Sequence, residues 1–147
     1  MANATEIKFG DPANRIAQSE RWSVLLRPRQ PTLGSLVLVC REPVLAFSDL
    51  SPEAFAELRD VVRKVEHMLR DYTAYERINY LMLMMVDPDV HFHVIPRYPG
   101  KRSFMGMEFP DVGWPGPPAL EPAVNLDDAA RDALVGELRQ AWHRAAA

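Results

Sequence analysis

The sequence predicts an α+β domain, an antiparallel sheet with helices packed on it, and three features of its 147 residues predict this class. Two pairs of strand-like runs are each separated by turn residues, which favours antiparallel hairpins. Helical patterns flank and separate these pairs, in the order helix-strand-strand-helix-strand-strand-helix. No internal repeat or change of composition divides the chain. We therefore expect residues 1–147 to form a single domain that ends in a helix.

The N-terminal elements are predicted from turn and cap residues. Asp11 followed by Pro12 is typical of a helix start, which predicts a short helix over residues 12–18. Residues 22–26 and 35–40 are strand-like, and the turn-rich residues 28–34 separate them. These two runs are expected to form a hairpin.

The next helix has the clearest start in the chain. Ser51 is a favourable cap, Pro52 suits the first helical position, and Glu53 interacts well with the positive end of the helix dipole. Apolar side chains at helical spacing predict that one face packs on the sheet: Phe55, Leu58, Val61, Val62, Val65, Met68 and Leu69.

A second hairpin is predicted downstream. Residues 78–86 form an almost unbroken apolar run, typical of a central strand covered on both faces. Asp87-Pro88 breaks this run, so a tight turn should lead into the next strand, with Met84 across from His91 and Met82 across from His93.

The strand after this turn carries the strongest functional signal. Side chains alternate along a strand, so Asp89, His91 and His93 should line one face. A cluster of ionisable groups is costly to bury unless it is paired or meets a ligand, which indicates a functional site. Two alternatives remain open at this point: a solvated polar face, and a metal site made of one carboxylate and two imidazoles.

The C-terminal part is predicted to be a long irregular segment followed by a helix. Residues 98–122 are rich in Pro and Gly and carry aromatic side chains that need a surface to bury against, either the chain's own sheet or a partner. Asn125 is expected to cap the last helix, with Asp127 and Asp128 in its first turn. Its inward residues are predicted to be Ala130, Leu134, Leu138, Ala141 and Trp142.

Composition narrows the class of protein. No apolar run approaches the ~20 residues that cross a bilayer, and the N-terminus lacks the features of a signal peptide, so we expect a cytoplasmic protein without membrane contact. The formal net charge of −3 gives no general attraction to nucleic acid. Cys40 lies in an apolar run, where a buried reduced thiol is expected.

The run from His91 to Arg97, His-Phe-His-Val-Ile-Pro-Arg, resembles the latter part of the histidine-triad signature. The resemblance continues upstream, where residues 24–26, 34–39 and 47–53 follow the order of that family's hairpin, its Gly-His-Leu-Val-type strand and its helix start. It covers roughly residues 20–98. It implies a histidine-triad-like sheet and a homodimer that binds nucleotides and hydrolyses or transfers nucleoside monophosphate groups.

By this resemblance His91 is the nucleophile that attacks an α-phosphate, and His93 is a proton donor or phosphate ligand. The family's first histidine is replaced by Asp89, and the histidine after Gly in the upstream strand by Ser35, a hydroxyl that is expected to bind phosphate near His91. Arg97 is a further candidate phosphate ligand because it has the strand parity of both histidines. No cofactor is required by this chemistry, and a divalent metal is expected at most with bound substrate.

Departures from the family pattern leave an alternative reading open. Asp89 can orient a histidine and stabilise an imidazolium, but its charge also repels a polyphosphate. Arg27 stands near the place where several members have a small polar residue that contacts ribose. The alternative to an enzyme is therefore a catalytically weak or inactive nucleotide-binding module.

Overall fold

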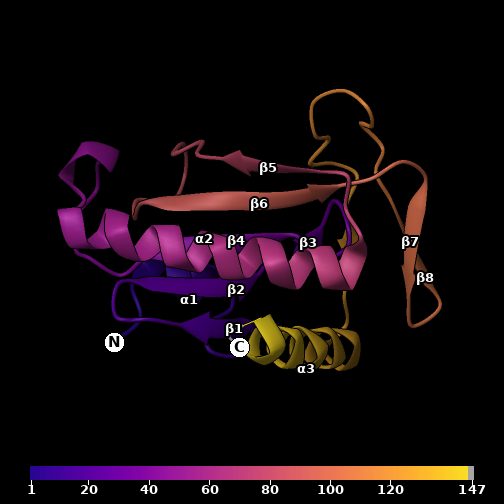
Figure 1. Cartoon of the computed structure of the whole chain (residues 1–147), viewed down its shortest axis with the longest axis horizontal. Helices are drawn as coiled ribbons and strands as arrows, with labels where there is room; N and C mark the ends of the chain where they lie inside the picture. Colours follow the sequence, from indigo (N-terminus) through magenta and orange to yellow (C-terminus); the bar gives the residue numbers. More distant parts are fainter. Residues whose placement is uncertain (146–147) are drawn as a thin grey trace.

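A five-stranded antiparallel sheet forms the centre of the computed structural model, which describes residues 1–145 (Figure 1). Its strands lie in the order β1 (Arg15–Gln18), β2 (Trp22–Leu26), β4 (Leu36–Cys40), β6 (His91–Arg97) and β5 (Arg77–Leu81). Every pairing between neighbours is antiparallel. The predicted α+β class is confirmed, and β2 pairs with β4 as the sequence predicts.

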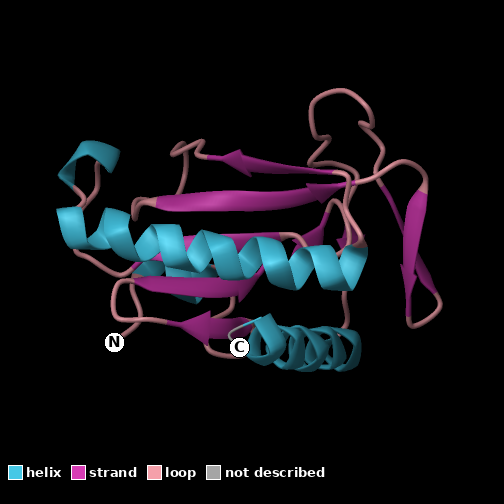
Figure 2. Cartoon of the chain, in the orientation of Figure 1, coloured by secondary structure: helices cyan, strands magenta, loops and turns pink. Residues whose placement is uncertain are grey.

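Helix α2 (Pro52–Thr73) lies across one face of the sheet, with α3 beside it (Figure 2). Its predicted start is correct, since the Ser51 hydroxyl accepts a hydrogen bond from the backbone N–H of Ala54 at 3.0 Å. The packed face is slightly rotated from the prediction, because Ala54 is fully buried whereas Phe55 is 44% exposed. Phe55 instead stacks on Phe47 at the rim, with their ring centroids 5.6 Å apart.

Helix α3 (Asp128–Ala145) packs against α2 and β1. Its predicted inward residues Ala130, Leu134, Leu138 and Ala141 are buried, whereas Trp142 is only partly buried against the core. The predicted cap is wrong. Asp127 accepts the hydrogen bond from the backbone N–H of Ala130 at 2.8 Å. Asn125 belongs instead to β9 (Val124–Asn125), which pairs with β3 (Arg29–Gln30). Asn125 is thus part of a strand, and Asp127 caps the helix instead.

The predicted helix over residues 12–18 is also wrong. A short helix, α1 (Ala4–Lys8), precedes this region, and Arg15–Gln18 forms strand β1 against β2. Asp11 does not cap a helix, because its carboxylate accepts two hydrogen bonds from the Arg15 guanidinium, at 2.7 and 3.0 Å. Sheet pairing overrides the local Asp-Pro signal here.

The predicted antiparallel pairing of the preceding strand with the histidine strand is confirmed, but the tight turn and the register that placed Met84 across from His91 and Met82 across from His93 are wrong. Strand β5 ends at Leu81, which pairs with His93, and residues 82–90 connect it to β6. β5 is therefore an edge strand and not a central one. Met84 has a positive φ of 52°, which a ladder cannot accommodate. This β5–β6 connection is held from outside the sheet by α1, through contacts described below.

The segment 98–122 is partly ordered by its own hairpin, β7 (Lys101–Phe104) and β8 (Met107–Pro110). Phe109 is fully buried in the main core, and its carbonyl accepts a hydrogen bond from the Tyr98 hydroxyl at 2.7 Å. The aromatic side chains of this segment thus find part of their burial within their own chain.

The two faces of the sheet differ. The face under α2 contributes to the main hydrophobic core, whereas the opposite face carries a small cluster of Leu25, Val37 and Val39 with Phe9 against it. Cys40 is a buried free thiol, as predicted. Across residues 1–145, none of the helices has both the length and the apolar character that spanning a bilayer requires.

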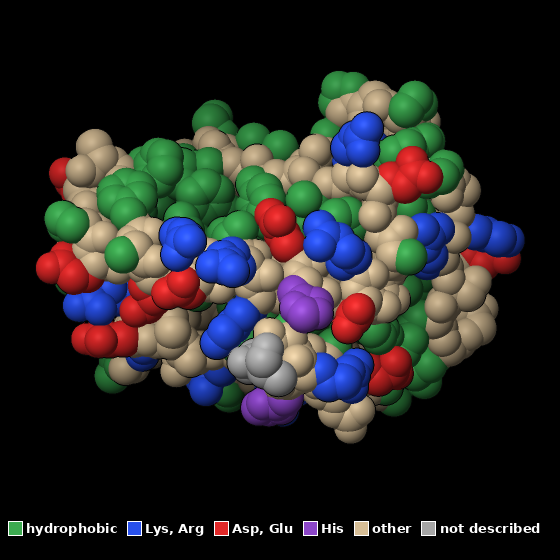
Figure 3. Space-filling model, in the orientation of Figure 1, with side chains coloured by type: hydrophobic (Ala, Val, Ile, Leu, Met, Phe, Trp, Pro, Cys, Tyr) green, Lys and Arg blue, Asp and Glu red, His purple; other side chains and the backbone are tan. Residues whose placement is uncertain are grey.

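Exposed apolar side chains gather at one end of the molecule. Figure 3 shows a hydrophobic patch over the start of α2 and the neighbouring short 3-10 helix η1 (Phe47–Asp49). The exposed large apolar residues of this region and of the β5–β6 connection are Leu45, Phe47, Phe55, Leu83, Met85 and Val86. We call this set the apolar end.

Candidate active site

His91 and His93 lie side by side on the face of the sheet away from α2, with ring centroids 5.3 Å apart. Val90 before them, Phe92 between them and Val94 after them belong to the main core on the other face. The predicted alternation therefore brings the two imidazoles together. Both are largely buried, with exposed fractions of 2% for His91 and 8% for His93.

The hydrogen bond made by His91 defines its tautomer. Its Nδ1 lies 2.7 Å from the backbone carbonyl oxygen of Asp89. A carbonyl can only accept, so Nδ1 carries the hydrogen. In the neutral imidazole the lone pair is then on Nε2, the atom that a nucleophilic histidine needs.

The opposite tautomer follows for His93. The Nε of Arg27 lies 3.4 Å from Nδ1 of His93, and a guanidinium can only donate. Nδ1 of His93 is therefore the acceptor, and Nε2 carries the hydrogen. Burial lowers the pKa of His93 to about 4, and the positive charge of Arg27 acts in the same direction. His93 is thus a neutral donor at neutral pH.

Asp89 lies just before β6, and its carboxylate is bound to the N-terminal helix and not to an imidazole. Its Oδ2 accepts hydrogen bonds from the hydroxyl of Thr5 at 2.8 Å and from its backbone N–H at 3.2 Å. The Thr5 hydroxyl in turn accepts from the backbone N–H of Asp89. Asp89 therefore orients His91 through its carbonyl, while its carboxylate fixes α1 to the histidine strand.

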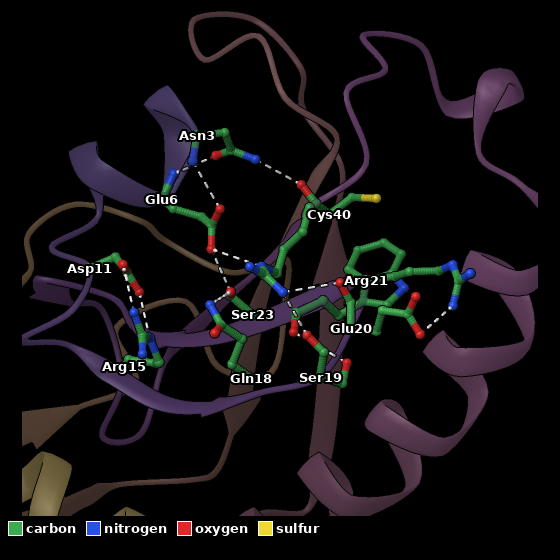
Figure 4. Close-up of polar contacts among 12 residues, drawn as sticks. Asn3, Glu6, Asp11, Arg15, Gln18, Ser19, Glu20, Arg21, Ser23 and Cys40 are labelled. Atoms are coloured by element: carbon green, nitrogen blue, oxygen red, sulfur yellow. Dashed lines mark hydrogen bonds and ion pairs between the residues drawn. The ribbon is translucent and has the colours of Figure 1, made fainter. Parts of the chain in front are cut away.

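A buried polar network holds α1 on the sheet (Figure 4). The Glu6 carboxylate is 1% exposed and accepts hydrogen bonds from the Ser23 hydroxyl and from the backbone N–H of Asn3. The Asn3 side chain donates to the carbonyl of Cys40 at 2.9 Å. These contacts to β2 and β4 place the residues that follow α1 directly over the histidines.

Phe9 is the residue so placed. Its ring centroid lies 6.1 Å from that of His91 and 5.7 Å from that of His93. Next to it a cavity of about 210 Å³ is lined by Lys8, Phe9, Arg27, Pro28 and Arg29. Sequence reasoning missed these residues as parts of the site, although the Arg-Pro-Arg run directly after a strand was a visible signal.

Ser35 precedes β4, one position before Leu36, which pairs with Val94 of β6. Its hydroxyl donates to the carbonyl of Thr32 at 2.9 Å and also lies 3.0 Å from the Thr32 hydroxyl. It therefore stabilises the turn before β4, and no hydrogen bond within residues 1–145 joins it to a histidine. A phosphate contact by Ser35 stays a prediction.

Arg97 lies at the far end of β6 and is 3% exposed. Its guanidinium binds the Asp111 carboxylate through two hydrogen bonds, at 2.7 and 3.1 Å. It also donates to the Asn79 side chain at 2.8 Å and to the Gly116 carbonyl at 3.0 Å. The predicted parity with the histidines is correct, but the structure gives this side chain four protein acceptors and does not bring it to the imidazoles.

A second, larger cavity of about 720 Å³ runs along the edge strand β5. It reaches from Arg97 and Trp114 to Leu81, the residue paired with His93. His93 itself lines neither cavity, but each cavity is lined by one of its neighbours, Leu81 or Arg27.

The metal-site alternative finds no matching geometry. In the part of the chain that the structure describes, no group of three or more His, Cys, Asp or Glu side chains is arranged to hold an ion. The Oδ2 of Asp89 and the Nδ1 of His91 are both occupied by hydrogen bonds.

Fold and site together define the class of histidine-triad proteins. The HIT domain family matches residues 9–100, which is more than half of the chain, so the chain belongs to this family. It is a family of nucleotide-binding hydrolases and transferases. Among curated proteins, none matches the chain.

Solved structures agree on the fold. A histidine triad protein from Sinorhizobium meliloti has a TM-score of 0.73 at 21% identity, covering 95% of each chain. One from Bradyrhizobium japonicum has a TM-score of 0.72 at 20% identity, covering 95% of this chain and 96% of its own. A zinc-bound histidine triad family protein from Mycobacterium smegmatis has 0.64 at 19%, with coverages of 95% and 91%.

Proposed function

We propose that this protein is a hydrolase or nucleotidyltransferase that attacks the α-phosphate of a nucleoside phosphate conjugate, such as a dinucleoside polyphosphate, through His91. The observation that carries the proposal is the pair of opposite tautomers. His91 presents a free Nε2 lone pair, and the adjacent His93 presents an Nε2 hydrogen. One ring is thus suited to attack phosphorus, and the other to bind a phosphate oxygen.

The proposed reaction has two steps. In the first, Nε2 of His91 forms a bond to the α-phosphorus while the bond from phosphorus to the leaving group breaks, and the leaving group takes the electron pair. His91 becomes a nucleotidyl-imidazolium whose Nδ1–H still donates its hydrogen bond to the Asp89 carbonyl. In the second, water or another acceptor displaces the imidazole and restores its neutral form. Two easier displacements replace one difficult step.

The tautomer of His93 favours one of its two predicted roles. Because Nδ1 accepts from Arg27, loss of the Nε2 hydrogen would leave an imidazolate anion. His93 is therefore better suited to hold a phosphate oxygen by hydrogen bonding than to protonate the leaving group. Such a donor stabilises charge that develops in the transition state. The scheme needs no cofactor, and a divalent metal enters only as a companion of a polyphosphate substrate.

A hydrolysis screen tests the proposal. The substrates are dinucleoside polyphosphates, nucleoside phosphoramidates, adenylylated conjugates and nucleotide sugars, which share the attacked phosphate. His91→Ala is expected to lower turnover by about 10³-fold or more, because it removes the attacking atom. His67→Ala, at an exposed position on α2, is the matched control and should retain full activity. Undiminished turnover by the His91 variant would refute the assignment.

The deep burial of both histidines favours a second candidate, a nucleotide-binding module with weak or no turnover. His91 is only 2% exposed beneath Phe9, so a substrate must displace protein atoms to reach its Nε2. Nucleotide binding by the wild-type protein without hydrolysis of any substrate in the screen would select this candidate.

We also propose that the protein is a homodimer. Two surfaces support this: the apolar end, and the outer edge of β5, which pairs with no further strand within residues 1–145. Exposed apolar patches and unpaired strand edges both mark sites of protein association. Light scattering at micromolar concentration should give twice the chain mass of 16.7 kDa. A mass near one chain contradicts the dimer.

A further inference from the structure

Three cationic side chains surround the smaller cavity beside His93. Lys8 is the last residue of α1, Arg27 directly follows β2, and Arg29 is the first residue of β3, so segments from two parts of the chain meet there. Phe9 and Pro28 complete the wall of this cavity of about 210 Å³. Arg27 connects the cavity to the candidate active site, since its Nε lies 3.4 Å from Nδ1 of His93.

The three cations differ in how their charge is balanced. Lys8 forms an ion pair with Asp87 at 2.8 Å, and Arg29 one with Glu121 at 2.8 Å. Both cations are about half exposed, so a ligand can reach them while they keep these partners. Arg27 is partly buried and forms no ion pair with any residue from 1 to 145.

Arg27 also has unused hydrogen-bonding capacity. Its Nη1 donates to the carbonyl of Arg29 at 2.7 Å and its Nε points to His93. For its Nη2, the described part of the chain supplies no acceptor. Desolvation lowers the pKa of Arg27, which means that burial disfavours its charge. Glu121 opposes this effect only in part, so an anion bound directly to the partly desolvated guanidinium would stabilise its charge further.

We propose that Lys8, Arg27 and Arg29 bind a phosphate group of the substrate other than the one that His91 attacks. This inference rests on the proposed function and narrows the substrate class to nucleotides with at least one further phosphate. The planar guanidinium of Arg27 can bind two oxygens of that group through Nη1 and Nη2 while its Nε keeps His93 in the donor tautomer. Phe9 covers the bound group from the side of α1.

Binding of inorganic tripolyphosphate tests the subsite without any need for turnover. Wild type is expected to bind it in isothermal titration calorimetry, and Arg27→Gln should raise the Kd about 10- to 100-fold, because a charge-assisted contact is lost. Arg27→Lys should recover part of the affinity. Arg59→Gln, on the exposed surface of α2, is the matched control and should bind like wild type. Equal binding by wild type and Arg27→Gln overturns the subsite.

A second variant guards against a folding defect at Arg27. Lys8→Gln combined with Arg29→Gln changes two side chains that are 52% and 50% exposed, so the fold should tolerate it. It is also expected to weaken tripolyphosphate binding, about 10-fold. Unchanged affinity of this folded double variant counts against the proposal as much as unchanged affinity of Arg27→Gln.

The further phosphate can belong to a polyphosphate chain or to the ribose, and two ligands distinguish these sources. Tighter binding of adenosine tetraphosphate than of AMP, lost in Arg27→Gln, identifies the chain. Tighter binding of adenosine 3′,5′-bisphosphate than of AMP, lost in the same variant, identifies the ribose. If neither ligand shows an Arg27-dependent gain in affinity over AMP, the inference is contradicted.

Failure of the subsite and failure of the proposed function give different results. If hydrolysis depends on His91 but tripolyphosphate binding does not depend on Arg27, the subsite is refuted and the proposed function stands. If tripolyphosphate binding depends on Arg27 but no substrate is hydrolysed, the subsite is supported and the proposed enzymatic function is refuted.

Discussion

The two ends of strand β6 both hold a buried or partly buried arginine, but they balance its charge differently. At the end near Tyr98, Arg97 has a carboxylate, an amide oxygen and a carbonyl as partners. At the histidine end, Arg27 faces a neutral imidazole and one carbonyl, and it has no ion pair among residues 1–145. The first arrangement is complete without a ligand, whereas the second is not.

This difference separates a structural arginine from a binding arginine. A guanidinium with all its partners in the protein fixes the loop that contains Asp111 and Gly116 onto the sheet. A guanidinium that lacks an anion is instead available to a substrate. The position of a residue along the strand does not distinguish a structural arginine from a binding one. Its hydrogen-bond and ion-pair partners do.

The largest effect among these predictions is expected from a substitution at His93, and it concerns catalysis. His93→Ala is expected to lower kcat/KM about 10²- to 10⁴-fold, because a hydrogen bond to the transition state is lost. His143→Ala, near the end of α3, is the control and should keep wild-type kinetics. Steady-state kinetics on the best substrate of the screen measure both. A loss below threefold in His93→Ala would show that this imidazole does not contact the reacting phosphate.

A substitution beside Arg97, at the other end of β6, should instead change the stability of the protein. Asp111→Asn leaves Arg97 buried without its carboxylate and is expected to lower the free energy of unfolding by about 3–5 kcal/mol. Urea unfolding measures it. Glu108→Gln removes the partner of Lys101 in an exposed pair and is the matched control, with an expected change below about 1 kcal/mol. Equal losses in the two variants contradict the distinction between a buried and an exposed pair.

The sequence predicted those features of the site that depend on local periodicity. The alternation of His91 and His93 and the cap at Ser51 follow from a few neighbouring residues, and both predictions were correct. The pairing of Leu81 with His93 was missed, because contacts from outside the sheet hold the β5–β6 connection. Lys8 binds Asp87 there, and no local pattern indicates such a contact.

The hydrogen-bond partners of the site residues could not be predicted from local sequence patterns for the same reason. Thr5 and Asp89 are 84 residues apart, and Arg27 and His93 are 66 residues apart. Asp89 was expected to act on a histidine through its carboxylate, but the buried Thr5 hydroxyl satisfies that group. Only the folded arrangement shows which polar groups are already paired, and pairing decides which groups remain for a ligand.

An intermediate effect is expected from the contact between α1 and the histidine strand. Thr5→Val removes the hydroxyl that binds the Asp89 carboxylate and should lower the free energy of unfolding by about 1–3 kcal/mol, since a buried acceptor loses a partner. Ser103→Ala, an exposed hydroxyl on β7, is the control and should be neutral. If Thr5→Val is as stable as wild type, this hydrogen bond does not hold α1 in place.

The smallest expected effect is a dependence of stability on pH that originates at His93. The pKa of His93 in the folded protein, about 4, lies below the ordinary histidine value of 6.5. Between these two pH values, His93 is therefore protonated in the unfolded chain but neutral in the folded protein. His93 therefore contributes no penalty above pH 6.5, and the free energy of unfolding falls as the pH decreases from 6.5 towards 4.

Urea unfolding at pH 7 and pH 5.5 measures this fall, and His93→Gln should reduce it because glutamine does not titrate. His67→Gln removes an exposed histidine and should leave the fall unchanged, so the comparison isolates the buried ring from the other titrating groups. Arg27→Gln should also make the fall smaller, since the charge of Arg27 lowers the pKa of His93. An identical fall in wild type and His93→Gln would mean that His93 is not held neutral by its surroundings, and the donor tautomer on which its phosphate role depends would lose its main support.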